Sequence, residues 1–357
     1  MTIEVDADYI SCDDAYDILT MMNNGCLDLD DLLDCAFNWN APMAISAHQP
    51  DRFYMGSQFL HKSDDMGDTW EIISPDLSTN DSTKQQQADS GGLSMDNSGA
   101  ENHTTIFTIA ESPLDENVIW VGTDDGNVQV TKDGGKNWQN VVSNIQGLPS
   151  NTWTYHIEAS VHGKGIAYAV FDGHNSGDMQ PYVYKTSDFG TTWTNIITDN
   201  VIGTSRNIQE DYENENLLFL GTEFGLYITA DGGSHWEKFT KNVPPVAIHF
   251  IDLQKQTNDL VLGTHGRGII IINDISPLRE ITSEVLKSKL HFFSSKPMKL
   301  SDESGFAGSF GAETQFVGEN ANRSPQIKYL LPKRHTFGKM TMEIKDSKGE
   351  VVSKLSP

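Results

Sequence analysis

The sequence predicts an all-β chain built from repeated four-stranded sheets, and three observations support this. Short apolar runs of strand length alternate with turns rich in Gly, Asn and Asp. One turn motif, Ser/Thr-x-Asp-x-Gly-x-x-Trp, occurs four times. The last interval between copies, from Trp193 to Trp236, lies in the range of roughly 40–50 residues of a propeller blade. We therefore expect a β-propeller of about five four-stranded blades, part of a larger array, followed by an incomplete β-sandwich.

Each copy of the motif closes a hairpin with its own turn chemistry. In the last copy we expect Asp231 to accept hydrogen bonds from turn N–H groups, Gly233 to supply a positive φ, and Trp236 to bury its ring beneath the turn. We interpret the motif as a structural staple at a blade edge, because it joins the third and fourth strands, away from the loops that would carry a site. The four copies contribute Asp65, Gly67, Trp70, Asp133, Gly135, Trp138, Asp188, Gly190, Trp193, Asp231, Gly233 and Trp236.

Composition limits the classes of ligand and of protein that the sequence can represent. A formal net charge of −25 argues against binding to nucleic acid phosphates or anionic membranes. We expect no membrane span, because no apolar run reaches the required length, and the first residues lack the basic and apolar regions of a signal peptide. All three cysteines precede the repeats, so no disulfide framework is expected there. We expect neither a cofactor nor a metal.

The chain divides into four parts. Residues 1–38 are an atypical acidic segment with a predicted helix over Cys12–Met22. Residues 39–281 carry the blades, residues 282–325 are a Ser/Gly-rich linker, and residues 326–357 alternate like the strands of a truncated immunoglobulin-like sandwich. The blade strands are predicted at 42–47, 52–56, 59–63 and 70–73; 105–111, 118–123, 127–131 and 138–142; 153–160, 165–170, 182–186 and 193–197; 205–211, 217–222, 226–229 and 236–240; and 247–253, 259–264, 268–273 and 278–281.

The turns between second and third strands share one face of the disc with the connections between blades. The connection over residues 74–104 is long and polar, and we expect little regular structure at its centre. Loops on a rigid scaffold carry function, so we interpret this face as a ligand-binding rim. Its candidate binding residues are His103, Asp125, Trp153, His174, Phe224, His265 and Arg267.

The motifs resemble the Asp-box (BNR) repeats of sialidases, xyloglucanase-type glycoside hydrolases and sortilin-like receptors. Segments such as ESPLDENVIWVGTDDGNVQVTKDGGKNW, LLFLGTEFGLY and GTHGRGIIIINDISPLR are similar to those of large bacterial exported proteins described as sortilin-like or glycosyl-hydrolase-like. The resemblance covers roughly residues 38–279. It implies an extracellular, periplasmic or cell-surface location, and it implies further blades or self-association to complete the propeller.

Three enzyme classes are the alternatives to a binding function. Sialidase chemistry needs three arginines, and only Arg206 and Arg267 fall at suitable strand ends. A metal hydrolase is disfavoured because the histidines of this face are isolated. A glycosidase that uses a carboxylate pair remains the alternative, with the candidate catalytic residues Asp124, Asp172 and Glu223. We favour a scaffold that binds a glycan or a protein segment, because aromatic rings beside carboxylates and histidines suit sugars.

Overall fold

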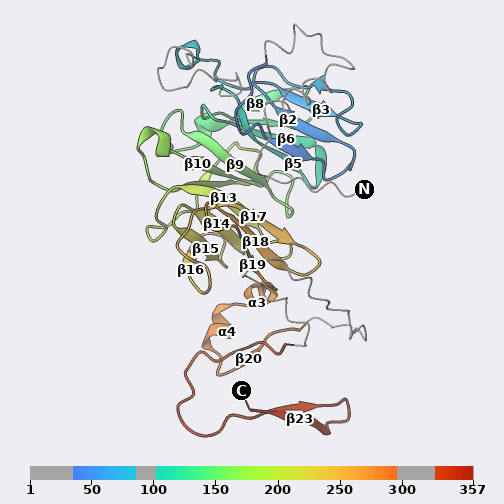
Figure 1. Cartoon of the computed structure of the whole chain (residues 1–357), viewed down its shortest axis with the longest axis vertical. Helices are drawn as coiled ribbons and strands as arrows, with labels where there is room; N and C mark the ends of the chain where they lie inside the picture. Colours follow the sequence, from blue (N-terminus) through green and yellow to red (C-terminus); the bar gives the residue numbers. More distant parts are fainter. Residues whose placement is uncertain (1–34, 86–101, 296–325, 357) are drawn as a thin grey trace, which may run out of the picture. The chain divides into compact units, whose positions relative to one another are not determined.

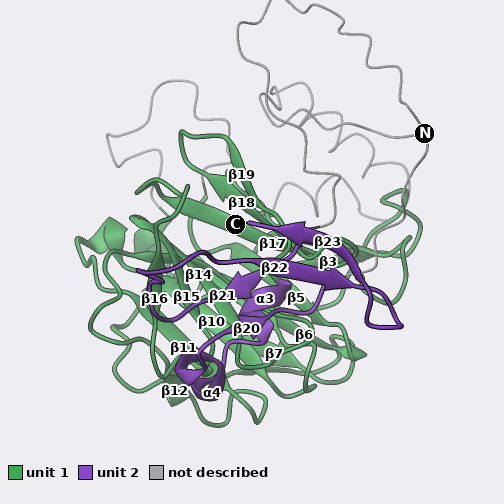
Figure 2. Ribbon diagram, turned by 90° about the horizontal axis from the view of Figure 1, so that it is seen from below, with its two compact units in different colours: residues 1–275 green, residues 276–357 purple. Residues whose placement is uncertain are grey.

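The computed structural model describes residues 35–85, 102–295 and 326–356. The chain forms two compact units, Met1–Ile275 and Ser276–Pro357 (Figure 2). The first unit is nearly all β and contains five antiparallel sheets that follow one another along the chain (Figure 1). These sheets are blades of a β-propeller, numbered here 1 to 5 in chain order. The predicted fold class is therefore confirmed.

The blades are built from short strands. Blade 1 has β1 (Met43–Ile45), β2 (Phe53–Gly56), β3 (Leu60–Ser63) and β4 (Glu71–Ile72). Blade 2 has β5 (Ile106–Ser112), β6 (Asp115–Thr123), β7 (Val128–Thr131) and β8 (Trp138–Asn140). Blade 3 has β9 (Trp153–Ala159), β10 (Ala167–Asp172), β11 (Tyr182–Thr186) and β12 (Thr194–Asn195). Blade 4 has β13 (Ser205–Glu210), β14 (Leu218–Thr222), β15 (Gly225–Thr229) and β16 (Glu237–Phe239); blade 5 has β17 (Ile248–Gln254), β18 (Asp259–Thr264) and β19 (Ile269–Ile272).

Every blade is a meander in which each strand pairs antiparallel with the next. The first strands of neighbouring blades, β5, β9, β13 and β17, pack against one another. Turns between the first and second strands, and between the third and fourth, consequently lie at one end of the blades. The other end carries the turns between the second and third strands and the connections to the next blade. We call this second end the loop face.

Apolar side chains fill the spaces between consecutive blades. The core between blades 2 and 3 includes Trp120 and Ile157, and the core between blades 3 and 4 includes Tyr168, Ile208 and Leu220. All of these side chains are at most 2 % exposed. Period-2 alternation places such residues on both faces of each blade, because each inner blade is sandwiched between two others.

Glycines allow the blades to approach. A Cβ on Gly56 would lie 2.7 Å from Ile106 Cγ2, and a Cβ on Gly221 would lie 2.6 Å from the Ile248 carbonyl oxygen. A Cβ on Gly122 would collide with Thr154 in the same way. Each glycine thus packs against a residue near the start of the next blade's first strand. A side chain in place of the glycine hydrogen would push the blades apart.

A buried glutamate joins blades 3 and 4. Glu210 lies at the end of β13 and accepts hydrogen bonds from Ser160 Oγ at 2.6 Å, from the Val161 N–H at 3.2 Å and from the Tyr168 hydroxyl at 2.8 Å. Saturating its oxygens in this way offsets the cost of burying a carboxylate. The same arrangement joins blades 1 and 2 through Ser46, Ala47, Tyr54 and Glu111.

The fifth blade has three strands in place of the four that the sequence predicts. The segment expected as its last strand, residues 278–281, instead overlaps the short helix α3 (Ser276–Arg279). Pro277 has no N–H to donate to a strand ladder and suits the first turn of a helix. Asp274, just before this helix, has a positive φ of 49°, and its N–H donates to Asp259 Oδ1 at 2.8 Å instead of continuing a strand.

The second unit contains α3, α4 (Ser283–Lys287) and two separate hairpin-like sheets. One pairs β20 (His291–Phe292) with β21 (Tyr329–Leu330), and the other pairs β22 (Met342–Lys345) with β23 (Val351–Leu355). Residues 283–292 are thus ordered into a helix and a strand, although the sequence was interpreted as linker there. β21 lies within residues 326–357, which were expected to form one sandwich, but it pairs with β20.

Some expectations fall outside the described residues: the helix over Cys12–Met22 and the centre of the long connection over residues 74–104. The described end of that connection forms a 3₁₀ turn, η1 (Ser82–Lys84), capped by the Asp81 carboxylate. Among the described helices none combines the length and the apolar character needed to cross a membrane.

Candidate functional site

A β-bulge near the loop face turns one side chain per blade out of the strand pairing in blades 2 to 5. In blade 2, Ile106 and Thr108 pair with adjacent residues of β6, which leaves Phe107 unpaired between them. Bulges re-aim a side chain and are common beside functional sites. The corresponding residues of blades 3, 4 and 5 are Tyr155, Arg206 and His249.

Tyr155 contacts the other three bulged side chains. The ring centroids of Phe107 and Tyr155 are 5.2 Å apart. The Arg206 guanidinium lies over the Tyr155 ring, 5.0 Å from its centroid, where the ring quadrupole attracts a cation. The Tyr155 hydroxyl lies 3.3 Å from His249 Nδ1. Tyr155 is thus the centre of a cluster drawn from four blades.

Further rings extend this cluster in both directions. Trp153 lies 5.2 Å from Phe107, and His103 is stacked 6.5 Å beyond Trp153. At the opposite end His265 is stacked on His249 at 5.4 Å. We call this continuous row the aromatic strip. Its members are His103, Trp153, Phe107, Tyr155, His249 and His265.

A cavity of about 370 Å³ opens beside the His103–Trp153 end of the aromatic strip. Its walls come from three connections at the loop face, those that precede β5 and β9 and the one that follows β10. They offer an indole ring, two basic groups, one carboxylate, amides and hydroxyls. The lining residues are Lys84, His103, Ser150, Asn151, Trp153, Asp172, Asn175 and Ser176.

Asp172, a predicted catalytic candidate, is held by protein partners. Its side chain has no exposed surface, and its Oδ2 forms an ion pair with Arg206 Nη1 and lies 2.6 Å from His174 Nδ1. Its Oδ1 accepts a bond from the His174 N–H at 3.0 Å. The structure therefore brings Asp172 and His174 together, with Arg206 as a third member that explains why a carboxylate is buried here.

Asp124 and Asp125 are buried, although the sequence was interpreted as placing them on an accessible rim. Asp124 Oδ1 accepts a bond from the Thr105 N–H at 2.9 Å, and its Oδ2 accepts one from Asn38 Nδ2 at 2.9 Å. Asp125 Oδ2 accepts bonds from the N–H and hydroxyl of Thr79 at 2.7 and 2.6 Å. Both carboxylates tie the connection before β5 to blade 2 and leave little capacity for a ligand.

Two histidines of the aromatic strip have shifted pKa values. A hydrogen bond to Asp124 raises the pKa of His103 above its ordinary value, against the opposing effect of burial. Burial, together with the positive charge of Arg206, lowers the pKa of His249. The pKa of His103, beside the cavity, is thus raised, whereas that of His249, on the other side of Tyr155, is lowered.

One carboxyl group has a strongly raised pKa, and it lies away from the loop face. Burial and the nearby charge of Glu210 raise the pKa of Glu158 to about 8, although Gln209 donates it a hydrogen bond of 2.7 Å. Glu158 is close to the far end of β9, several residues beyond Trp153. It is therefore separate from the aromatic strip and the cavity.

The remaining predicted site residues lie elsewhere on the loop face. Phe224 covers Gly203, where a Cβ would approach its ring to 2.6 Å. Glu223 donates its N–H to the Thr204 carbonyl at 3.0 Å. Arg267 is exposed in the β18–β19 turn. None of the three lines the cavity beside Trp153.

The four Asp motifs occupy the turns between third and fourth strands, at the end opposite the loop face. In blade 3, Thr186 Oγ1 accepts the Gly190 N–H at 2.9 Å and donates to Asp188 Oδ1 at 2.9 Å. Asp188 Oδ1 also accepts the Thr192 N–H at 2.8 Å, and Trp193 Nε1 donates to the Gly190 carbonyl at 3.1 Å. The hydroxyl–aspartate–glycine bonds recur in the copies at Ser63, Thr131 and Thr229.

These turn hydrogen bonds favour the charged carboxylate. Bonds from Thr69 lower the pKa of Asp65 to about 2, and bonds from Asn137 lower the pKa of Asp133 to about 2. The motif aspartates therefore stay ionised while they order their turns.

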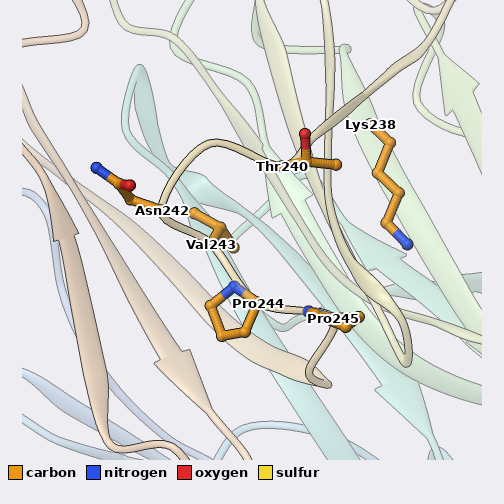
Figure 3. Close-up of a pocket in the computed structure, with 6 residues that line it drawn as sticks. All are labelled: Lys238, Thr240, Asn242, Val243, Pro244 and Pro245. Carbon is orange, nitrogen blue, oxygen red and sulfur yellow. The ribbon is translucent and has the colours of Figure 1, made fainter.

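A second cavity of about 520 Å³ lies along the connection between β16 and β17 (Figure 3). It is lined by Lys238, Thr240, Asn242, Val243, Pro244 and Pro245. Lys238 lies 5.9 Å from the Tyr227 ring centroid. Two adjacent prolines shape this wall, and no aromatic or acidic side chain lines it. Within the described ranges no group of three His, Cys, Asp or Glu side chains is placed to hold a metal ion.

Sequence reasoning missed Lys84 and three members of the bulged cluster, Phe107, Tyr155 and His249. A signal was present: in blades 2 to 5 the bulged residue stands two positions before an isoleucine of the first strand. The four isoleucines are Ile109, Ile157, Ile208 and Ile251.

Comparison with known proteins gives one sequence relative and several similar folds. No family model matches the sequence. An oligoxyloglucan-reducing end-specific xyloglucanase of Emericella nidulans is 30% identical over 91 residues, which cover 24% of this chain and 10% of that protein. The GH74 enzyme of Niastella koreensis superposes with a TM-score of 0.48 at 18% identity over 65% of this chain. The GH74 xyloglucanase of Xanthomonas campestris gives 0.47 at 18% identity over 68%. The matches span only 36% and 37% of those two solved chains.

Proposed function

We propose that the protein binds a glycan on its loop face, with Trp153 as the stacking platform and the adjacent cavity as the hydrogen-bonding site. The observation that carries the proposal is the juxtaposition of the aromatic strip and the polar cavity. Sugar rings stack on aromatic faces, and their hydroxyls bond to the kinds of amide and hydroxyl groups that line the cavity. A row of rings across four blades suits an extended polysaccharide better than a single sugar.

A neutral β-glucan of the xyloglucan type is the ligand class we propose. The support is the similarity to a xyloglucanase over 91 residues. The cavity offers a ligand little net charge, since Asp172 is matched by Arg206 and His103 is matched by Asp124, and Lys84 adds a single positive charge. We further propose that the protein works outside the cytoplasm, where such polysaccharides are met. Cell fractionation with an antibody against the chain checks this location.

Binding is favoured over hydrolysis because two of the candidate carboxylates are already engaged. A carboxylate-pair glycosidase needs one carboxyl group that donates a proton and a second that acts as base or nucleophile. Asp124 and Asp172 instead hold buried hydrogen bonds and an ion pair. The xyloglucanase similarity keeps hydrolysis as the second candidate function.

The test is calorimetric titration of the full chain with xyloglucan oligosaccharides. Trp153→Ala should weaken binding at least about tenfold, because it removes the platform. Phe337→Ala, which removes an 88 % exposed ring from the second unit, is the matched control and should bind like the wild type. Absence of binding to xyloglucan and to a broad glycan array, or unchanged affinity of Trp153→Ala, would contradict the proposal.

The same samples decide between binding and hydrolysis. We expect no release of reducing ends on prolonged incubation with xyloglucan. Sustained release that disappears in Asp172→Asn, in a variant that still melts like the wild type, would establish the hydrolase.

A further inference from the structure

The two end blades expose apolar side chains at positions that are buried or partly buried in the other blades. On β19, Ile269 is 72 % exposed. Ile269 pairs with Gly263, and the residues equivalent to Gly263 in blades 2, 3 and 4 are Gly122, Val170 and Gly221. The counterparts of Ile269, which pair with these three residues, are Val128, Val183 and Leu226. All three counterparts have no exposed surface, because the following blade covers them.

Blade 1 shows the complementary exposure. Met43 and Ile45 of β1 are 65 % and 68 % exposed. By register, the counterparts of Met43 are Ile109, Ile157, Ile208 and Ile251, which the preceding blade covers. Ile109 is partly buried, and the other three are at most 6 % exposed. Blade 1 therefore exposes the face that normally receives a preceding blade, and blade 5 exposes the face that normally receives a following one.

The two faces are the halves of one interface that the chain already forms four times. Within the described ranges, extensive strand packing joins only consecutive blades, and β17–β19 do not pack along β1–β4. On blade 5, Phe250 (69 % exposed) and Ile271 (55 % exposed) lie beside Ile269 on the same face, so the exposed patch is apolar. Apolar patches of this kind mark interaction sites.

We propose that the blade 5 face of one copy docks on the blade 1 face of a second copy, head to tail. Continuity with the interfaces inside the chain identifies the occupant, since what covers each equivalent position is a blade of this same sequence pattern. Because the two faces differ, the contact is heterologous and joins copies into chains or rings rather than into symmetric pairs. The net charge of −25 opposes this docking, so salt should strengthen it by screening.

The test uses two single variants, each blocking one end. Met43→Glu disables the blade 1 face, and Ile269→Glu disables the blade 5 face. Both residues are exposed, so unchanged melting curves are expected. In light scattering after size exclusion, the wild type should form oligomers that grow with concentration and with salt. Each variant alone should be monomeric, with a dissociation constant raised at least about tenfold.

Mixing the variants gives the decisive readout. An equimolar mixture of Met43→Glu and Ile269→Glu should form one-to-one pairs, since each supplies the face that the other lacks. Leu114→Glu, an exposed residue of the β5–β6 turn, is the control and should assemble like the wild type. A wild type that stays monomeric at high salt and concentration, or a mixture that stays monomeric, overturns the proposal. So does a monomer whose Met43 and Ile269 are protected from surface labelling, because another segment of the chain then covers them.

Discussion

At the residue scale, burial and neighbouring carboxylates set the charge of the histidines. His61 has no exposed surface, lies 2.7 Å from Ser57 Oγ through Nε2, and is stacked on Phe37 at 6.0 Å. Its Nδ1 lacks a partner in the described part of the chain. Burial lowers the pKa of His61 to about 4, since an imidazolium would be poorly solvated there.

This predicts an acid-sensitive fold. His61 is neutral in both states above pH 6.5, so it does not affect stability there. Below pH 6.5 the unfolded chain takes up a proton that the folded chain refuses until about pH 4. The free energy of unfolding should therefore fall across this window, by up to about 3 kcal/mol from His61. Urea unfolding at a series of pH values measures the fall.

The matched variant for this prediction is His61→Gln, which keeps a polar group near Ser57 and cannot titrate. Its unfolding free energy should change less between pH 6.5 and pH 4 than that of the wild type. An identical slope would show that His61 is not responsible. Two other groups titrate in this window: the pKa of His156, lowered to about 4, adds to the fall, and the pKa of Glu158, raised to about 8, opposes it. The difference between the wild type and His61→Gln therefore isolates the contribution of His61.

Sequence reasoning located only part of the site at this scale. Trp153, Asp172 and His103 were predicted because they stand at strand ends, and the structure brings them to one cavity. Phe107 and Tyr155 were missed because strict alternation assigns them to a blade face. The bulge, which shifts the register by one residue, depends on packing between first strands and cannot be read from periodicity.

At the element scale, the Asp turn is an independent unit that the sequence describes well. In blade 4, Asp231 Oδ1 accepts bonds from Thr229 Oγ1 at 2.8 Å and from the His235 N–H at 2.9 Å. Gly233 has a φ of 96°, as its place in the motif predicts. Local side-chain-to-backbone bonds of this kind depend on spacing alone, which explains why four turns could be located from the sequence.

Asp231→Ala should lower the free energy of unfolding by about 1–3 kcal/mol, because the His235 N–H and the Thr229 hydroxyl lose their acceptor. Asp231→Asn keeps an acceptor oxygen and should lose less. Glycan affinity should be unchanged in both variants, since this turn lies at the end opposite the loop face. Reduced affinity at unchanged stability would show that the turn takes part in binding. Chemical denaturation and calorimetric titration provide the two readouts.

At the scale of the whole molecule, repetition made the blade order predictable. The repeated motif fixes where each third strand ends, so the other strands could be assigned by counting apolar runs. The last strand of blade 5 was predicted wrongly, because an apolar run alone does not show that Pro277 and the positive φ of Asp274 divert the chain into α3. The pairing of β20 with β21 was missed because long-range pairing leaves no local signal.

The glutamate contacts between blades predict a further stability difference. Tyr168→Phe removes one donor from the buried Glu210 and should lower the free energy of unfolding by about 1–3 kcal/mol. Tyr227→Phe is the matched control and should cost less, since its hydroxyl accepts only a 3.4 Å bond from the Ile202 N–H. Equal losses in the two variants would show that the contact to Glu210 contributes nothing. Between blades 2 and 3, Trp120 takes the place of the tyrosine and Ala159 takes the place of the glutamate. An apolar contact of the larger ring therefore replaces the polar contact there.

The glycines between blades have a consequence for how such a chain can evolve. Gly56 receives Ile106, and Gly221 receives Ile248, whereas the corresponding pair between blades 3 and 4 is Val170 and Ser205. In this pair the larger side chain belongs to the preceding blade, whereas in the other two pairs it belongs to the following blade. If blades 3 and 4 exchanged places, Val170 would face Ile248 and two large side chains would compete for one space. Gene duplication that copies a single blade is therefore compatible with the packing at some junctions and not at others. The side-chain sizes in these pairs restrict which blades can be neighbours.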